Sequence, residues 1–188
     1  METFTNEIEM YEILDAVHRN PHHILGMHEI EKDEKRCLII RAFIPTAKEI
    51  LVIDDTNKDV TYKMEKIHDH GFFICVLEDR QEFFRYKLKV EGYYDNSWTI
   101  YDPYEFMPVL SDYDDYIFGE GNHYEIFEKL GSHIMEVDGV WGVNFAVWAP
   151  NARRVSVVGN FNDWDGRRGL MRSRGSSGIW ELFVPGLK

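Results

Sequence analysis

The sequence predicts a mainly β protein: two tandem immunoglobulin-like β-sandwich modules, each preceded by a short helix, with the second lacking its last strands. Three observations support this. Short apolar runs alternate with polar residues at the period of a half-buried strand. Turn residues separate these runs, and only two short segments suggest helices. The pattern also repeats after about 105 residues, which is the length of a domain.

The first helix is expected to begin at Asn6, which can cap it, with Glu9 at the reciprocal position of a capping box. Its apolar stripe consists of Met10, Tyr11, Leu14 and Val17. Asn20 and Pro21 should end it, because the residue before a proline disfavours the helical conformation. Three histidines follow within residues 22–28, and the spacing favours hydrogen-bonded imidazoles at a helix-to-strand junction over a metal site.

The first module is then expected to contain six strands, at residues 37–44, 50–53, 61–66, 72–77, 84–90 and 98–101. Residues 86, 88 and 90 are apolar, whereas Lys87 and Lys89 alternate with them. This strand should therefore have one buried face and one solvent-exposed face. Asp54 and Asp55 open a turn, where solvated carboxylates are commoner than an acid–base pair.

Residues 108–120 are expected to connect the modules, so the predicted domains are residues 1–110 and 111–188. Asp112, Asp114 and Asp115 suggest a solvated connector and lack the alternating ligand pattern of a calcium loop. No metal or cofactor site is predicted. A short helix is expected at 123–130, with Gly131 as its cap.

The second module is expected to contain a strand at 143–147, a break at Pro150 and a further strand at 155–158. Residues 159–166, Gly-Asn-Phe-Asn-Asp-Trp-Asp-Gly, form a turn-rich loop that carries two large aromatic side chains.

The internal repeat is visible in Leu25-Gly26-Met27-His28, which recurs as Leu130-Gly131-Ser132-His133. At the same offset Pro45 matches Pro150, and with a small shift residues 71–77 match 178–184. The second copy lacks a counterpart of residues 84–104, so the chain is expected to be a truncated piece of a longer protein. An incomplete sandwich predicts marginal stability, disorder, or strand exchange and dimerisation through the second half.

The composition excludes several classes of partner. A formal net charge of −12 argues against nucleic acid and anionic membranes, and no apolar run approaches the ~20 residues of a membrane span. The acidic N-terminus is unlike a secretory signal. Cys37 and Cys75 lie in apolar runs, which favours two buried thiols in a reducing cytoplasm.

A neutral polysaccharide fits this charge, because its binding requires aromatic platforms and groups that reach hydroxyls. The second copy provides Asn160, Asn162 and Trp164 in one loop, beside Asp163. The first copy provides Lys87 and Trp98 instead, and its own loop has no aromatic residue. Each copy therefore carries a complementary half of a candidate site. Three alternatives stay open: Trp164 packs on the edge of its own sandwich, Lys87 belongs to a solvated strand face, and Trp98 belongs to the edge of the core.

Residues 124–133, 144–152 and 159–166 together resemble the carbohydrate-binding module of family 48. That module precedes the catalytic barrel in glycogen branching and debranching enzymes. Residues 22–28, 102–104 and 118–123 resemble the extra N-terminal domain of bacterial 1,4-α-glucan branching enzymes. The resemblance covers nearly the whole chain, and the tandem arrangement favours branching over debranching.

The resemblance implies a non-catalytic N-terminal part of an enzyme that cuts α-1,4-glucan and transfers the piece to a 6-hydroxyl. The catalytic carboxyl groups would lie on a barrel after this region, so no residue here is assigned to catalysis. Similar modules bind glycogen with a loop tryptophan at the place of Trp164, and with a lysine and tryptophan at the places of Lys87 and Trp98. The expected partners are α-glucan and the barrel of the same parent chain. A stand-alone glycogen-binding or scaffold module, and part of a debranching or trehalose-forming hydrolase, remain open.

Overall fold

The structure is a computed structural model that describes residues 5–94 and 96–187, and it is mainly β, as predicted. The chain divides into two compact units. Unit 1 contains the residues up to Leu14 together with His22–Glu105. Unit 2 contains Asp15–Pro21 together with Phe106 and the residues after it.

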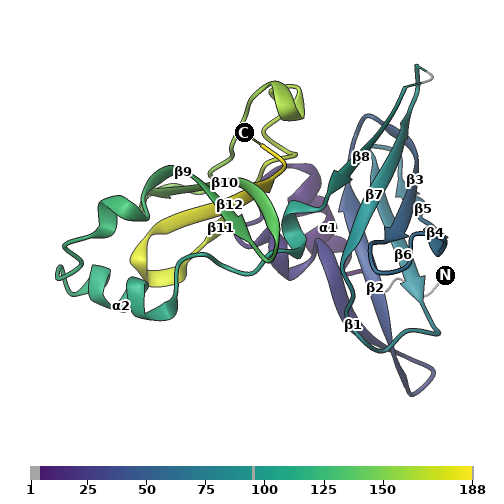
Figure 1. Ribbon diagram of the computed structural model, residues 1–188, viewed down its shortest axis with the longest axis horizontal. Helices are drawn as coiled ribbons and strands as arrows, with labels where there is room; N and C mark the ends of the chain where they lie inside the picture. The colour runs from purple at the N-terminus through teal and green to yellow at the C-terminus, as the bar shows by residue number, and fades with distance from the viewer. Residues whose placement is uncertain (1–4, 95, 188) are drawn as a thin grey trace. The chain divides into compact units, whose positions relative to one another are not determined.

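Unit 1 is a sandwich of two antiparallel four-stranded sheets (Figure 1). The first sheet has the order β1-β2-β6-β5, with bounds β1 (Gly26–Lys32), β2 (Lys35–Phe43), β6 (Phe72–Leu77) and β5 (Glu65–His68). The second has the order β4-β3-β7-β8, with bounds β4 (Thr61–Lys63), β3 (Ala47–Asp54), β7 (Tyr86–Gly92) and β8 (Ser97–Tyr101). Their facing side chains form one core, in which Leu38, Ile50 and Leu88 are fully buried.

Two strand predictions in unit 1 were wrong in detail. Residues 61–66 are two strands in different sheets, because the chain crosses between them at Met64, whose N–H donates to the Ile50 carbonyl. β1 was not predicted as a strand. It lies at the edge of its sheet, and most of its residues are polar, as is common in edge strands.

Helix α1 (Glu7–Leu14) is shorter than predicted. Asn6 does cap it, since its Oδ1 accepts the Ile8 N–H at 3.0 Å. The helix ends well before Pro21, and Ala16 has a left-handed φ of 57°. The expected helical position Val17 is 49% exposed, so the apolar stripe ends at Leu14.

Unit 2 has one antiparallel sheet of order β11-β12-β10-β9 (Figure 1). Its strands are β9 (Gly131–Val137), β10 (Val140–Trp148), β11 (Arg172–Ser173) and β12 (Ile179–Pro185). The strand predicted at 143–147 is confirmed within β10. Within the described residues of both units, the short 3-10 helices are η1 (Pro21–His23), η2 (Pro103–Glu105), η3 (Ile126–Glu128), η4 (Asn160–Asn162) and η5 (Gly175–Ser177).

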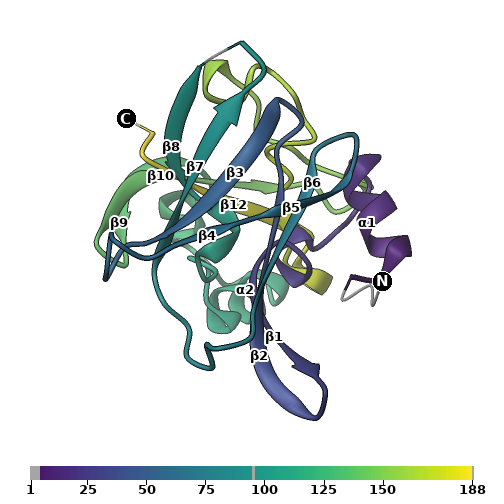
Figure 2. The same cartoon turned by 90° about the vertical axis from the view of Figure 1, so that its right-hand side faces the viewer.

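The repeat is preserved in the two hairpins. β9 and β10 occupy the same bounds as β1 and β2 when the numbering is shifted by the repeat of about 105 residues. In β1–β2 the turn residues Asp33 and Glu34 have φ of 49° and 61°, and Figure 2 shows the two strands side by side. In β9–β10 the turn residues Asp138 and Gly139 have φ of 50° and 79°. Two positive φ values define the type I′ turn that matches strand twist.

Residues 155–158 do not form the predicted strand. Only an isolated bridge joins Ser156 to Leu170, and Val157 N–H donates to the Gly169 carbonyl at 2.8 Å. The equivalent strand in unit 1, β3, is paired along its length with β7. In the part of unit 2 that the structure describes, no strand occupies the position of β7. The backbone of residues 155–158 therefore has no partner strand with which to form β-sheet hydrogen bonds.

The predicted connector contains helix α2 (Asp112–Gly119), which was not predicted. The helix expected at 123–130 is limited to the single 3-10 turn η3. Ser111 and Asp114 form a reciprocal capping box that starts α2. Arg174 pairs with Asp112 and Asp115, and the Asp115 side chain is largely buried, whereas that of Asp112 stays fully exposed.

The two cysteines are buried free thiols. The register places Cys37 opposite Ile30 and Cys75 opposite Ile40, so their side chains lie on opposite faces of one sheet. A disulfide between them is excluded by this geometry. Among the described residues, no helix is long and apolar enough to cross a membrane.

Candidate carbohydrate-binding site

The loop of residues 159–168 in unit 2 is built around the buried amide of Asn162, which is 3% exposed. Its Oδ1 accepts the Gly159 N–H at 2.9 Å, and its Nδ2 donates to the Val157 carbonyl at 2.8 Å. Both ends of the amide are thus engaged by the loop backbone. Asn162 holds the loop together from the inside.

Trp164 projects from this loop and is 68% exposed. Its Nε1 donates to Asn160 Oδ1 at 3.0 Å, and its backbone N–H donates to the Gly159 carbonyl at 3.0 Å. The indole has no other polar atom. The ring is therefore held in one orientation while its faces remain available to a ligand, which lowers the entropic cost of binding.

The backbone at the tip of the loop is strained. Asp163 and Trp164 have φ of 55° and 59°, in the left-handed region that favours glycine. Such a conformation persists only where its surroundings determine it, and such residues cluster at ligand sites. Here the surroundings are the hydrogen bonds to Gly159 and Asn160.

The charged residues of the loop pair with one another. Arg167 donates to both carboxylate oxygens of Asp165, and Arg168 Nη1 lies 2.6 Å from Asp163 Oδ2. The Arg167 hydrogen bonds hold the pKa of Asp165 below its usual range. The loop around Trp164 therefore presents no unbalanced charge, as a neutral ligand requires.

The other two predicted residues, Lys87 and Trp98, lie in unit 1. Lys87 in β7 pairs with Tyr101 in β8, and Trp98 pairs with Val90. Because neighbours along a strand alternate between faces, Lys87 and Trp98 point to opposite faces of the sheet. Trp98 packs against the core, and Lys87 lies 2.9 Å from Asp55 on the outer face. The structure does not bring these two residues together.

Sequence reasoning missed Tyr101, whose ring centre lies 4.5 Å from Lys87 Nζ on the outer face. The alternation in Trp98-Thr99-Ile100-Tyr101 contains the signal, because it separates Trp98 and Ile100 from Tyr101.

The histidines near residue 25 have other partners. His28 Nε2 lies 2.9 Å from the Leu25 carbonyl oxygen, and His23 Nδ1 lies 3.2 Å from Glu9. The His22 ring packs edge to face against Tyr104. Over residues 5–94 and 96–187, no group of three or more His, Cys, Asp or Glu side chains could hold a metal ion.

The β-sheet of unit 2 and its tryptophan-bearing loop belong to a carbohydrate-binding type of module, as the match to a family model shows. Residues 129–188 match carbohydrate-binding module 48, the isoamylase N-terminal domain. Residues 6–104, more than half of the chain, match the N-terminal domain of alpha-1,4-glucan branching enzyme GlgB. The chain belongs to this branching-enzyme family.

Similar full-length proteins are branching enzymes by name. The 1,4-alpha-glucan branching enzyme GlgB of Trichormus variabilis is 49% identical, covering 89% of this chain and 22% of its own length. The GlgB of Synechocystis sp. is 46% identical, and the match covers 98% of this chain and 24% of that protein. The chain thus spans less than a quarter of the length of these relatives. The crystal structure of a pullulanase from Anoxybacillus sp. LM18-11 is 16% identical, covers 85% of this chain and 21% of its own, and has a TM-score of 0.23, too low to support an inference.

Proposed function

We propose that the chain is the non-catalytic, glucan-binding N-terminal part of a glycogen branching enzyme. The parent enzyme would cut an α-1,4-glucan and transfer the piece to a 6-hydroxyl. The observation that carries the proposal is the ring of Trp164, exposed and fixed by Asn160, in the unit that matches a carbohydrate-binding module.

Binding here would raise the local concentration of glucan at the catalytic part of the same parent protein. A neutral platform suits this role, because glucan carries no charge that a basic surface could attract. The two units would also brace a catalytic barrel of the parent chain. Their proposed location is the cytoplasm, where Cys37 and Cys75 stay unpaired.

The proposed contacts with sugar come first from the Trp164 ring and the Asn160 amide, while Asn162 supports them from inside the loop. Lys87 and Trp98 enter the proposal separately. Lys87, with Tyr101 beside it, would donate hydrogen bonds on the outer face, and Trp98 would contribute through its half-buried edge. Self-association through the apolar residues of unit 2 is also proposed, since Trp141, Val147 and Trp148 are exposed.

Retardation of the 188-residue chain in a native gel that contains glycogen tests the proposal. Trp164→Ala should abolish most of the retardation. Tyr124→Ala is the matched control, because Tyr124 is an 85% exposed aromatic residue of the same unit that lies outside the loop of residues 159–168. Equal migration of wild type and Trp164→Ala would show that the loop is not the binding platform.

A further inference from the structure

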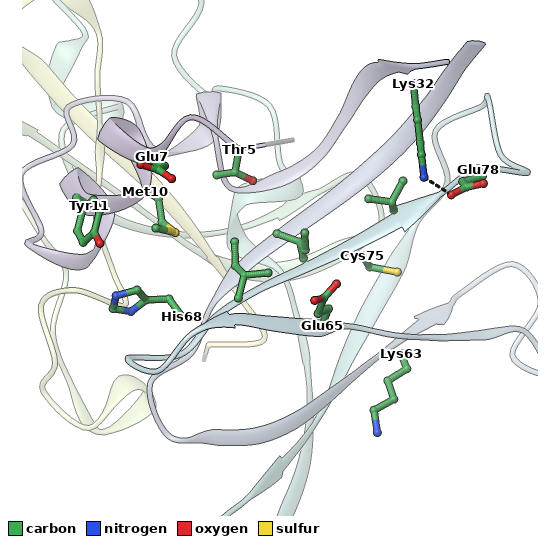
Figure 3. Close-up of a pocket in the computed structure, with 13 residues that line it drawn as sticks. Thr5, Glu7, Met10, Tyr11, Lys32, Lys63, Glu65, His68, Cys75 and Glu78 are labelled. Atoms are coloured by element: carbon green, nitrogen blue, oxygen red, sulfur yellow. Dashed lines mark hydrogen bonds and ion pairs between the residues drawn. The ribbon is translucent and has the colours of Figure 1, made fainter. Parts of the chain in front are cut away.

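Unit 1 contains a groove of about 680 Å³ that the carbohydrate module does not include. Helix α1 forms one wall, through Glu7, Met10 and Tyr11, and the outer face of β5 and β6 forms the floor. Figure 3 shows Tyr11 and His68 near one end, and the ion pair of Lys32 and Glu78 near the other. The volume lies in the range of small-ligand sites.

The floor is apolar because of strand alternation in β6. Phe73, Cys75 and Leu77 point into the sandwich core, so Ile74 and Val76 lie on the opposite face. Helix α1 buries Ile13 and Leu14, but Ile74 and Val76 stay half-buried in the groove. An apolar strip thus remains open along the strand.

The wall is held in place. Arg41 Nε donates to Thr5 Oγ1 at 3.0 Å, which fixes the residue just before the helix, and both residues are buried. At the other side Tyr11 meets the His68 ring edge to face, with ring centres 5.8 Å apart. The groove is therefore formed before any ligand arrives.

The rim selects against anionic ligands. Lys32 pairs with Glu78 at 2.6 Å and Lys63 pairs with Glu49 at 2.7 Å, so the lysines are matched by carboxylates. Glu7 and Glu65 add further carboxylates. A phosphate or nucleic acid would be repelled, whereas the hydroxyl groups of a neutral polyol can donate hydrogen bonds to the carboxylate oxygens of the rim.

We propose that this groove binds a short stretch of α-1,4-glucan, a second site separate from the Trp164 loop. Tyr11, 52% exposed, is the aromatic platform at one end, and Ile74 and Val76 lie under the C–H faces of the sugar rings. Glu65 accepts hydroxyl hydrogen bonds from the rim. The choice of ligand rests on the proposed function, while the groove itself does not.

The test is titration of the 188-residue chain with maltoheptaose, followed residue by residue in amide NMR spectra. In the wild type, amides of Tyr11, Ile74 and Val76 should shift. Tyr11→Ala should weaken the response of the groove by roughly tenfold, which corresponds to ~1.4 kcal/mol, and leave that of the Trp164 loop unchanged. Tyr11→Phe, which keeps the ring, should retain groove binding.

Tyr94→Ala is the matched control, because Tyr94 is 93% exposed in unit 1 and does not line the groove. Shifts confined to residues 159–168 would overturn the groove and leave the proposed function standing. Groove shifts that persist in Tyr11→Ala would overturn the role of Tyr11 as the platform. No response at either place, with no retardation by glycogen, would overturn both proposals.

Discussion

Lys87 Nζ lies 4.5 Å from the ring centre of Tyr101, on the outer face of a sheet whose inner face carries Trp98. The phenol of Tyr101 and the carboxylate of Asp55 both raise the pKa of Lys87. The charged ammonium group of Lys87 thus lies over the face of an aromatic ring on one side of the sheet. On the other side, Trp98 contributes mainly to the core.

The first prediction separates these two residues. Trp98→Ala should lower the free energy of unfolding of unit 1 by about 2 kcal/mol, since it leaves a cavity against the core. Lys87→Ala should cost less than ~1 kcal/mol, because its ion pair lies at the surface. Urea titration followed through resonances of β7 and β8 measures both. Equal losses would contradict the assignment of the two side chains to different faces.

The second prediction concerns the loop of Trp164. Asn162→Ala removes the partners of the Gly159 N–H and the Val157 carbonyl, which should cost about 1–3 kcal/mol. Retardation by glycogen should fall with it, because Trp164 loses its support. Asn160→Ala should also weaken glycogen binding, because it removes the indole partner and a proposed sugar contact, but it should cost less stability than Asn162→Ala, since the buried Asn162 bonds remain. A variant at Asn162 that keeps both its melting temperature and its glycogen binding would disprove this.

The third prediction is acid sensitivity at Asp114. Burial alone would raise its pKa, but hydrogen bonds from Ser111 and contact with His123 and Lys129 lower it to about 2. This value lies below the ~3.9 of an unfolded aspartate. The ionised Asp114 should therefore add about 2 kcal/mol to the free energy of unfolding. This contribution is complete above pH ~4 and is lost as the pH falls towards ~2. Melting of unit 2 against pH should show this slope, and Asp114→Asn should lack it.

The fourth prediction has the opposite sign. Burial raises the pKa of Asp102 to about 6, although it accepts hydrogen bonds from Tyr104 N–H and the Tyr86 hydroxyl. Because the folded-state pKa is raised, unit 1 should lose stability as the pH rises from ~4 to ~6, on the order of 3 kcal/mol. Glu105, with a pKa raised to about 8 by burial, should add a loss that runs from pH ~4.5 to ~8. Asp102→Asn should therefore make the pH dependence between ~4 and ~6 less steep in melting curves and leave the loss above pH ~6 unchanged.

The fifth prediction uses the two hairpin turns as mutual controls. Glu34 has a left-handed φ of 61°, whereas the equivalent position of β9–β10 is Gly139. Glu34→Gly should stabilise unit 1 by about 0.5–1 kcal/mol, because glycine adopts this conformation without strain. Gly139→Glu should destabilise unit 2 by a similar amount. Thermal unfolding of the two variants against wild type decides the matter, and changes of the same sign would refute it.

Much of the fold follows from local pattern. β2, β3, β6, β7, β8 and β10 follow from alternation and turn residues, and β12 from the repeat. The strand expected at 155–158 failed because propensity alone cannot supply a ladder partner. Helix α2 was missed because its aspartates suggested a solvated connector, although the Ser111–Asp114 spacing of a capping box was visible.

The candidate site was predictable only in part. The turn-rich loop around Trp164 follows from its composition, but the sequence left open whether Trp164 is an exposed platform or packs on the edge of its own sandwich. That Asn162 points inward depends on its bond to Val157, which no spacing rule specifies. The separation of Lys87 from Trp98 depends on strand register, where a slip of one residue exchanges the two faces.

The two-residue turns also set an order of events during folding. A hairpin such as β1–β2 or β9–β10 closes within about 1–10 μs, because its strands are joined by the shortest of loops. Pairing of β3 with β7 must close a much longer loop and incurs more chain entropy before any contact forms. The hairpins should therefore form early in both units, and the pairing of β3 with β7 should follow. As the chain emerges from the ribosome, each unit would have its first hairpin in place before its later strands are synthesised.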